Sequence, residues 1–243
     1  MTEGSVAIVT GAAGGIGREI VARLHGDGAA IVAEDIDPAV TELEGERIVA
    51  VQGDAALAST ARHAVRTALD HFGRLDVLVN NAARFLLKPI LETTDEEWDG
   101  LMAANVRSVF VHCREALPPM LERGAGSIVN LASISGLVGL RSQPVYSATK
   151  GAIVQLTRQL AVEYAGRGVR VNAVAPGAVD TPFVERAVGA PVDDRRKEMA
   201  AAHPMGRVAT PAEIAEVIAF LASPAASFVT GSIVAADGGY TAA

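Results

Sequence analysis

The sequence is short of several residue types, and each shortage narrows what the protein can be. Cys113 is the one cysteine in 243 residues, which excludes an internal disulfide and a cysteine cluster with zinc-ligand spacing. The net charge is -7 and no run of basic residues occurs. This balance argues against nucleic acid or an anionic membrane surface as a partner.

Long apolar runs are also missing. None approaches the ~18 residues needed to cross a bilayer. The opening residues, "MTEGSVAIVTG", pass directly into a strand pattern and leave no room for a signal peptide. We therefore expect a soluble, cytoplasmic protein without a metal centre.

Hydrophobic residues, in contrast, make up half of the chain, which is enough for a sizeable core. Short apolar segments bounded by turn residues recur at 6–10, 30–34, 47–52, 75–80, 127–132, 169–174 and 232–236. Most are apolar almost throughout, as in strands covered on both faces, and helical patterns lie between them. This alternation predicts a parallel sheet with helices on both sides. No linker or change of composition interrupts it, so we expect one domain over residues 1–243.

The largest departure from the alternation is the segment 182–210, which prolines and glycines interrupt repeatedly. It follows the sixth predicted strand, and ligands of such sheets bind beyond the carboxyl ends of the strands. The position predicts a substrate lid. A solvated surface excursion fits the composition equally well.

A glycine-rich turn, "TGAAGGIG", joins the first predicted strand to the first predicted helix. Gly11, Gly15 and Gly17 allow a tight turn in which backbone N–H groups approach a pyrophosphate, beside the partial positive charge of a helix N-terminus. A lone glycine turn is weak evidence, because many tight turns need glycine. Its place between strand and helix predicts a dinucleotide site.

The second predicted strand ends in "AEDID", which places Asp35 18 residues after Gly17. An acidic side chain at this point accepts hydrogen bonds from the adenosine ribose and repels a 2′-phosphate. No lysine or arginine lies at positions 12–14 or directly after Asp35. Strand alternation lets only one of Glu34 and Asp35 face the cofactor, and we assign Asp35. The pattern favours NAD over NADP, with a solvated acidic turn as the alternative.

The stretch "VYSATKGA" carries Tyr146 and Lys150 four positions apart at the start of an apolar helical pattern. Such positions share one face of a helix, so a phenol and an ammonium are expected side by side. Lowering a tyrosine pKa from ~10 to near neutrality takes about 4 kcal/mol. An ammonium at ~4 Å supplies about that amount at an effective dielectric of ~20, while burial opposes it. The pair predicts a tyrosine base that removes a proton from an alcohol.

Six features follow one another along the chain: "TGAAGGIG", "NNAA" at 80–83, Asn105, Ser133, "YSATK" at 146–150 and "PGAVDT" at 176–181. Each is weak alone, but Ser133 lies thirteen residues before Tyr146 and the order is specific. Together they resemble the short-chain dehydrogenase/reductase family over essentially the whole chain. The resemblance implies an α/β fold: a doubly wound, Rossmann-type parallel sheet of seven strands in the order 3-2-1-4-5-6-7.

The resemblance also implies roles for the catalytic residues. Tyr146 would act as general acid/base, and Lys150 would lower its pKa and bind the nicotinamide ribose. Ser133 would hold the substrate oxygen, with Gln143 and Tyr146 also near the substrate. Asn105 would hold a water that connects Lys150 to solvent. Independently, Asn105 shares an apolar helix face, and a buried amide without partners costs ~1–3 kcal/mol.

Cofactor contacts follow from the glycine turn, the acidic residue and the resemblance. The predicted contacts are Gly11, Ala13, Gly15, Ile16, Gly17, Asp35, Ile36, Asp54, Ala55, Asn81, Ala82, Ala83, Tyr146, Lys150, Pro176, Gly177, Val179 and Thr181. Asp54 resembles the residue that binds the adenine amino group, and residues 176–181 resemble the segment that fixes the nicotinamide carboxamide. The family usually has glycine where this chain has Ala83, which slightly alters backbone approach there.

Two predicted helices, residues 97–122 and 146–165, are apolar around much of their circumference. Because a sheet covers only one side of a helix, we expect them to pair across a two-fold axis in a homodimer or homotetramer. The five histidines form no motif, and His203, within residues 182–210, is the one placed where it could touch substrate.

The pattern as a whole predicts an NAD-dependent oxidoreductase that interconverts a secondary alcohol and a ketone. A 3-oxoacyl-carrier-protein reductase is one alternative, which Asp35 disfavours because such enzymes usually prefer NADPH. A non-catalytic NAD-binding regulator is another, which the complete set of catalytic residues disfavours. The sequence indicates a small-molecule substrate but does not identify it.

Overall fold

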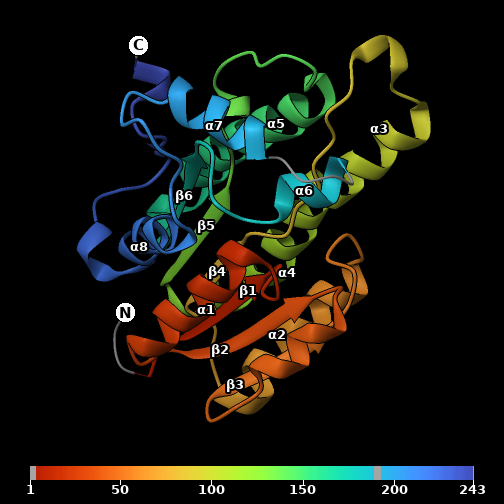
Figure 1. Cartoon of the computed structure of the whole chain (residues 1–243). Coiled ribbons are helices and arrows are strands. Elements are labelled where there is room, and N and C mark those ends of the chain that lie inside the picture. The colour runs from red at the N-terminus through yellow and green to blue at the C-terminus, as the bar shows by residue number, and fades with distance from the viewer. Residues whose placement is uncertain (1–3, 189–192, 243) are drawn as a thin grey trace.

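The predicted apolar segments form one parallel sheet, which the computed structural model describes for residues 4–188 and 193–242 (Figure 1). The strands lie in the order β3-β2-β1-β4-β5-β6-β7, as predicted. Their bounds are β1 Val6–Thr10, β2 Ala30–Asp35, β3 Ile48–Gln52, β4 Val77–Asn80, β5 Gly126–Leu131, β6 Val169–Pro176 and β7 Ile233–Ala236. All neighbouring pairs run parallel, so every strand ends at the same edge of the sheet.

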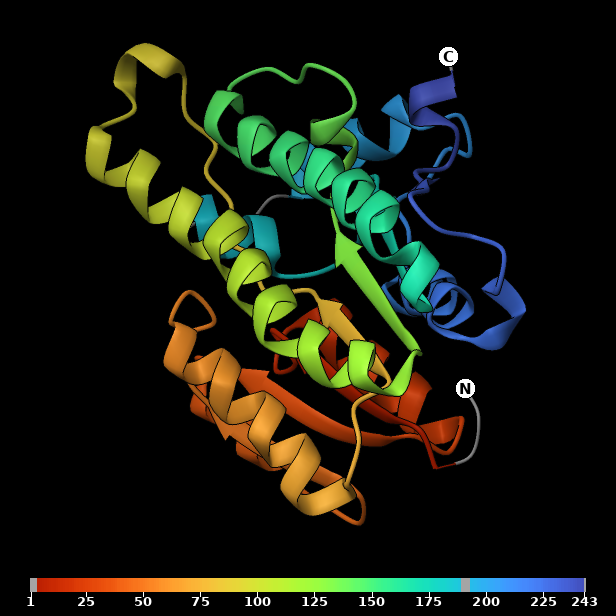
Figure 2. The ribbon, with the colours of Figure 1, turned by 180° about the vertical axis from the view of Figure 1, so that it is seen from behind.

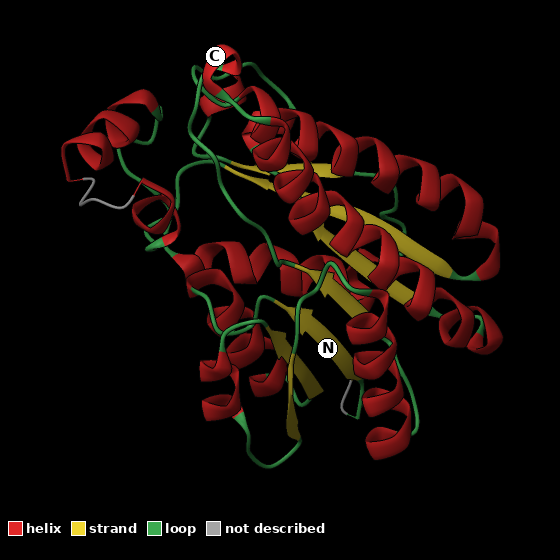
Figure 3. Ribbon diagram, turned by 90° about the vertical axis from the view of Figure 1, so that its right-hand side faces the viewer, coloured by secondary structure: helices red, strands yellow, loops and turns green. Residues whose placement is uncertain are grey.

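Helices cover both faces of this sheet (Figure 3). The helices are α1 Gly15–Gly26, α2 Ala58–Phe72, α3 Asp95–Met102, α4 Ser108–Arg123, α5 Pro144–Tyr164, α6 Phe183–Val188, α7 Asp193–Ala202 and α8 Pro211–Ala222. Short 3-10 turns lie at Pro38–Leu43, Ile90–Glu92, Ile134–Gly136, Ala165–Arg167, Pro224–Ala226 and Tyr240–Ala242. In the part of the chain that the structure describes, no helix is both long and apolar enough to span a membrane.

The two faces bury separate apolar layers, because side chains alternate along each strand. Val6 and Ile8 of β1 join one layer, which α2, α4 and α5 cover (Figure 2). Ala7 and Val9 join the other layer, beneath α1 and α8. β1 is buried throughout, which explains why its sequence is apolar rather than alternating.

The helix predicted for residues 97–122 is confirmed, because the chain is helical without interruption from Asp95 to Arg123. It begins after Thr94, whose hydroxyl and the Glu97 carboxylate form a capping box. Within it, the π-helical segment Ala103–Arg107 lies between α3 and α4. Such wide turns often occur at functional sites, and this one contains Asn105. Apolar periodicity alone did not reveal this segment.

The segment 182–210 contains the two helices α6 and α7. Its ends meet where Ala178 and Asp180 exchange backbone hydrogen bonds with Ala209: Asp180 N–H donates to Ala209 at 2.8 Å, and Ala209 N–H donates to Ala178 at 2.9 Å. The segment is therefore a loop closed at its base, beyond the carboxyl end of β6.

Candidate active site

A cavity of about 1530 Å³ opens at the carboxyl edge of the sheet. Its wall includes all the predicted cofactor contacts and the predicted substrate contacts Ser133, Gln143 and Tyr146. Asn105 is the one predicted site residue that does not line it. Residues from the ends of six strands, β1 to β6, and from the segment 182–210 thus meet in one place, as the parallel topology requires.

The glycine turn lies at one end of this cavity. Gly11 has a φ of +66°, and a Cβ added there would lie 2.8 Å from the Cα of Ala82. A Cβ on Gly17 would lie 2.0 Å from the carbonyl oxygen of Gly11. The N-terminus of α1 follows, with Gly14 as its N-cap and no side chain hydrogen-bonded to the cap. Backbone N–H groups at this helix end suit a phosphate.

Asp35 and Glu34 point to opposite faces of the sheet, as strand alternation predicted. The Asp35 carboxylate lies at the cavity and accepts hydrogen bonds from the backbone N–H groups of Ala13 and Asp37, both at 2.9 Å. Glu34 is fully buried, and its carboxylate lies 2.8 Å from Nε2 of His112 on α4. Burial lowers the pKa of His112, but the hydrogen bond and charge of Glu34 outweigh it and raise the pKa above the ordinary value.

The turn after β4 is tied to the glycine turn. The Asn81 amide donates to the carbonyl oxygens of Thr10 and Gly11, both at 2.9 Å. The Thr10 hydroxyl accepts from the N–H groups of Asn81 and Ala82, at 3.1 and 3.0 Å. These bonds close the floor of the cavity between β1 and β4. Ala83 follows at the cavity wall.

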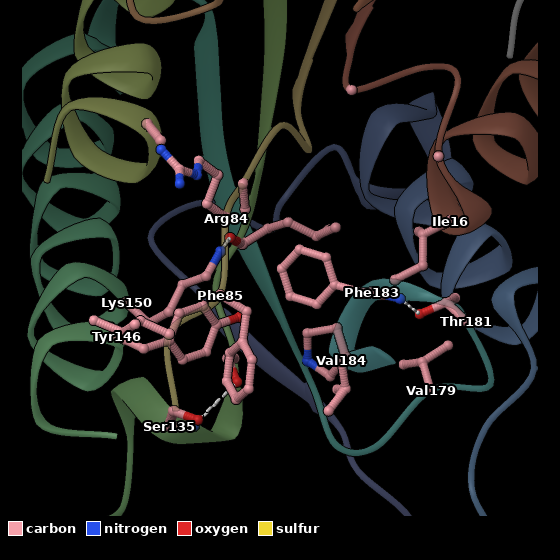
Figure 4. A pocket seen from close by; sticks show the side chains of 18 of the residues that line it. Ile16, Arg84, Phe85, Ser135, Tyr146, Lys150, Val179, Thr181, Phe183 and Val184 are labelled. Atoms are coloured by element: carbon pink, nitrogen blue, oxygen red, sulfur yellow. Dashed lines mark hydrogen bonds between the residues drawn. The ribbon is translucent and has the colours of Figure 1, made fainter. Parts of the chain in front are cut away.

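Tyr146 and Lys150 lie on one face of α5 beside the cavity, as their spacing predicted (Figure 4). Tyr146 is 7% exposed and Lys150 is 2% exposed. The ammonium nitrogen lies 5.6 Å from the centroid of the tyrosine ring and donates a hydrogen bond of 2.7 Å to the Leu131 carbonyl. The end of β5 thereby fixes the lysine under the tyrosine.

The electrostatic balance of this pair differs from the sequence expectation. Burial raises the pKa of Tyr146 above the usual value, although the hydrogen bond with Ser133 acts in the opposite direction. Burial also lowers the pKa of Lys150 to about 7. The burial of both groups, with the ammonium directed at the Leu131 carbonyl, outweighs the attraction of phenolate and ammonium. The neutral phenol is therefore the stable form in the protein alone.

Ser133 begins a chain of hydrogen bonds. Its hydroxyl lies 3.2 Å from that of Ser135 and accepts from the Ser135 N–H at 3.1 Å. The Ser135 hydroxyl in turn donates to the Gln143 side-chain carbonyl at 2.9 Å. Ser133 is the one that pairs with Tyr146, so the structure places it, and not Ser135, at the phenol.

Asn105 is fully buried and supports the site from behind. Its side-chain carbonyl accepts from the Arg84 N–H at 2.7 Å, and its amide donates to the Arg84 carbonyl and the Thr149 hydroxyl at 2.9 and 3.0 Å. Thr149 belongs to α5, between Tyr146 and Lys150. The amide has the partners that burial demands, and they join the turn after β4 to the catalytic helix.

Sequence reasoning missed the aromatic wall near Tyr146. The Phe85 ring packs edge-on against Tyr146 with a centroid distance of 4.8 Å, and Phe183 lies 5.9 Å from Phe85 (Figure 4). Val184 also lines this part of the cavity. Phe85 lies two residues after "NNAA", which was a usable signal, whereas Phe183 is 98 positions further along the chain and only folding brings it close.

These features fit a dinucleotide with a nicotinamide group. Side chains at Gly11 or Gly17 would clash with neighbouring backbone, so only glycine permits this tight turn at the cavity wall. A helix N-terminus at the cavity wall suits a pyrophosphate, an acidic side chain suits a ribose diol, and a buried phenol beside an amine suits proton transfer. The cavity is large enough to hold such a cofactor together with a small substrate.

Comparison with known proteins agrees with this site. A family profile described as enoyl-(acyl carrier protein) reductase matches residues 11–241. A galactitol 2-dehydrogenase (L-tagatose-forming) from Cereibacter sphaeroides is 45% identical, over 98% of this chain and 96% of that protein. A cis-4-hydroxycyclohexanecarboxylate dehydrogenase from Sinomonas cyclohexanicum is 44% identical, over 98% and 96%. The solved structure of ElxO with NADP bound has a TM-score of 0.91 and 28% identity, over 98% of this chain and 99% of that one.

Fold, site and comparisons converge on one class of protein. The chain belongs to the short-chain dehydrogenase/reductase family. It is an oxidoreductase that acts on CH–OH groups and requires a nicotinamide cofactor.

Proposed function

We propose that the protein interconverts a secondary alcohol and a ketone with NAD as cofactor. The observation that carries this proposal is the buried Tyr146 phenol, hydrogen-bonded to Ser133 and stacked over Lys150, at a cavity that begins with the glycine turn. When bound, the cofactor supplies or accepts the hydride. The residues of this chain bind it, exclude water and handle the proton.

The adenosine half of the cofactor would be held by the glycine turn, by Asp35 at the ribose and by Asp54 near the adenine. The nicotinamide half would be held by Lys150 and by the segment 176–181. Asp35 supports NAD, because its carboxylate would repel a 2′-phosphate. One structural relative has NADP bound, so the proposal of NAD rests on Asp35 of this chain and not on the comparison.

Proton transfer in this proposal runs through the Tyr146 hydroxyl. Because burial keeps the phenol protonated, Tyr146 is poised to donate a proton to a ketone oxygen that Ser133 also holds. In the reverse direction Tyr146 takes the alcohol proton. This requires the phenolate to be stabilised by Lys150 and by the positive charge of the oxidised nicotinamide. Asn105 completes the site as the residue expected to hold a relay water, and its main role in the fold is to join Arg84 to Thr149.

The substrate class follows from the wall near Tyr146. Phe85, Phe183 and Val184 make this region apolar, whereas Ser133 and Gln143 supply polar groups. Such a mixture suits a cyclic, sugar-derived or hydroxyacyl alcohol. The named relatives act on a polyol and on a hydroxylated ring acid, which supports this range.

We also propose that residues 1–243 form one domain and that the segment 182–210 acts as its substrate lid.

We also propose that the protein is a cytoplasmic homodimer or homotetramer. On the outer faces of α4 and α5, Phe110 remains 50% exposed and Val162 remains 83% exposed. A second copy of the chain on these faces would bury both side chains. Light scattering at micromolar concentration should give a mass of two or four chains, and a stable monomer would contradict this assignment.

The function is tested by incubating the protein with NAD and a panel of cyclic, sugar-derived and hydroxyacyl alcohols while following nicotinamide absorbance. Tyr146→Phe should lose about 10²–10⁴-fold in turnover while still binding NAD. Tyr240→Phe is the matched control, because Tyr240 also lines the cavity but lies against His203 rather than beside Ser133. It should retain most of the activity.

The same assay separates the alternatives. Preference for NADPH with a 3-oxoacyl thioester would favour the carrier-protein reductase, and a 3-oxoacyl-[acyl-carrier-protein] reductase from Thermotoga maritima is 36% identical over 98% of this chain. Tight NAD binding with no turnover of any panel member would favour a regulatory protein. Equal turnover by Tyr146→Phe and the unmodified protein would contradict the proposed chemistry itself.

A further inference from the structure

His203 lies at the junction of three segments that line the cavity. It directly follows α7 within residues 182–210, and its ring contacts Tyr240 of the C-terminal turn at a centroid distance of 5.1 Å. Its third neighbour is the segment after β6. A Cβ added to Gly177 would lie 2.4 Å from Nε2 of His203, so the imidazole fits directly against the backbone there. The side chain is 5% exposed.

Both ring nitrogens of His203 have a hydrogen-bond partner, and these partners determine which nitrogen carries the proton. The backbone N–H of Ala178 donates to Nε2 at 3.1 Å. Because an N–H can only donate, Nε2 must be unprotonated. Nδ1 then carries the proton and donates to the Met199 carbonyl at 2.6 Å. The observed contacts therefore belong to the neutral imidazole alone.

This arrangement links α7 to the wall of the nicotinamide end of the cavity. Gly177 and Ala178 are the backbone that the imidazole contacts, and Pro176, Gly177 and Val179 line the cavity. The base of the segment is held by the backbone bonds between Ala178, Asp180 and Ala209. His203 adds a side-chain contact from the far end of the loop, so the position of α7 and the shape of residues 177–179 depend on each other.

We propose that neutral His203 is a positioning residue that holds residues 177–179 in the shape that receives the cofactor, and that its protonation releases α7 from them. The proposal rests on the proposed function in taking the ligand to be a nicotinamide dinucleotide. A proton on Nε2 would face the Ala178 N–H, donor against donor, and the bond would break. Cofactor affinity should therefore fall when the solution becomes acidic enough to protonate this imidazole.

The charged and titratable groups around this junction have their own partners. In the C-terminal turn, the Asp237 carboxylate accepts from the N–H groups of Gly239 and Thr241 and from the Thr241 hydroxyl. On α7, Arg196 pairs with Asp180 at 2.6 Å and lies 3.9 Å from Glu185. Lys197 and Glu198 lie on the same helix and are exposed. Beyond α7, Arg207 pairs with Glu213.

Two substitutions separate the hydrogen bond from the packing. His203→Phe keeps a ring against Tyr240 but removes the acceptor, leaving the Ala178 N–H without its partner. His203→Gln offers a side-chain oxygen as acceptor and does not titrate. His63→Gln is the matched control, because His63 is an exposed histidine on α2. Circular dichroism of each variant establishes that it is folded.

The main measurement is the dissociation constant for NAD, obtained by direct binding between pH 5.5 and 8 without substrate. For the unmodified protein and His63→Gln it should rise several-fold from pH 8 to pH 5.5. His203→Gln should show a clearly smaller change of affinity with pH than the unmodified protein, because only the titration of groups such as Lys150 remains. His203→Phe should bind about tenfold more weakly than the unmodified protein at pH 8, as expected for one lost hydrogen bond to a buried group. If His203→Phe fails to fold, the reduced pH dependence of His203→Gln still decides the question.

A second measurement does not involve the cofactor. Amide exchange at Ala178, corrected for its intrinsic pH dependence, should be slow at pH 8 and faster at pH 5.5 in the unmodified protein. It should be fast at both pH values in His203→Phe. Unchanged NAD affinity and unchanged Ala178 exchange in His203→Phe, or the ordinary pH profile in His203→Gln, would overturn the inference. Absence of NAD binding by the unmodified protein at all pH values would instead overturn the proposed function, and exchange at Ala178 would then decide the His203 contact by itself.

Discussion

The two ends of the cavity are built by different means. At the adenosine end, backbone groups do most of the work: the glycine turn, the helix N-terminus and the N–H groups that bind Asp35. At the catalytic end, buried side chains dominate, with Tyr146, Lys150 and Ser133 joined by side-chain contacts. The adenosine end is a binding surface that the folded backbone provides. At the catalytic end, ionisable side chains are buried away from water, where they can take part in proton transfer.

The difference has an energetic consequence. Asp35 is at the cavity surface, where its carboxylate is compatible with water and with backbone donors. Lys150 is almost fully buried with a carbonyl as its partner, and its pKa of about 7 shows that the protein disfavours its charge. Functional sites often retain groups that lower stability in this way. The catalytic end should therefore destabilise the fold, and the adenosine end should not.

The largest effect should come from Lys150→Met, which sharpens this comparison. Turnover should fall by about 10²–10⁴-fold, while unfolding at pH 7 should require more free energy, by on the order of 1–3 kcal/mol. The folded-state pKa lies below the unfolded value, so the unmodified protein gains stability as pH rises from 7 towards 10.5. The advantage of the variant should vanish over that range in denaturant titrations. A variant that is less stable at pH 7 would contradict the assigned cost of the buried amine.

A smaller effect is expected at the adenosine end. Asp35→Ser should raise the KM for NAD by about 10–100-fold and improve the use of NADP, because the carboxylate at the ribose site is removed. Stability should change little. Asp37→Ser is the control: Asp37 also lines the cavity, but its carboxylate caps the short turn that follows it. Loss of NAD affinity in Asp37→Ser alone would show that the ribose site had been assigned to the wrong carboxylate.

The smallest effect should come from the buried pair Glu34 and His112. This pair lies behind the adenosine end, so it tests whether only the catalytic end of the cavity buries ionisable groups. The folded-state pKa of His112 is raised, so its contribution is fully present below pH 6.5 and is lost as pH rises through the folded-state pKa. Relative to Glu34→Leu/His112→Leu, the unmodified protein should lose about 1 kcal/mol between pH 6 and pH 9. Urea titrations measure this difference, and Glu122→Gln, an exposed change on the same helix, is the control. A constant difference across this range would mean that the pair does not titrate.

Sequence reasoning succeeded where a local pattern has a single structural meaning. The glycine turn and the spacing of Tyr146 and Lys150 fix positions on short stretches of backbone, and the structure places them at the cavity as expected. It did not reveal the π-helical segment Ala103–Arg107 within the predicted helix 97–122, because apolar residues continue on both sides of that segment. The pKa direction of Tyr146 was also missed, since burial depends on how α5 packs rather than on the residues next to the phenol.

The sequence by itself determined the seven strands, the order of the functional residues along them and the rule that only one of Glu34 and Asp35 can face the cavity. These follow from periodicity and from the alternation of side chains along a strand. Only the tertiary structure decided that Phe183 meets Phe85, that Asn105 joins Arg84 to Thr149, and that His203 reaches Ala178. These contacts join residues from different segments. Their geometry depends on how whole elements pack, which no short sequence pattern records.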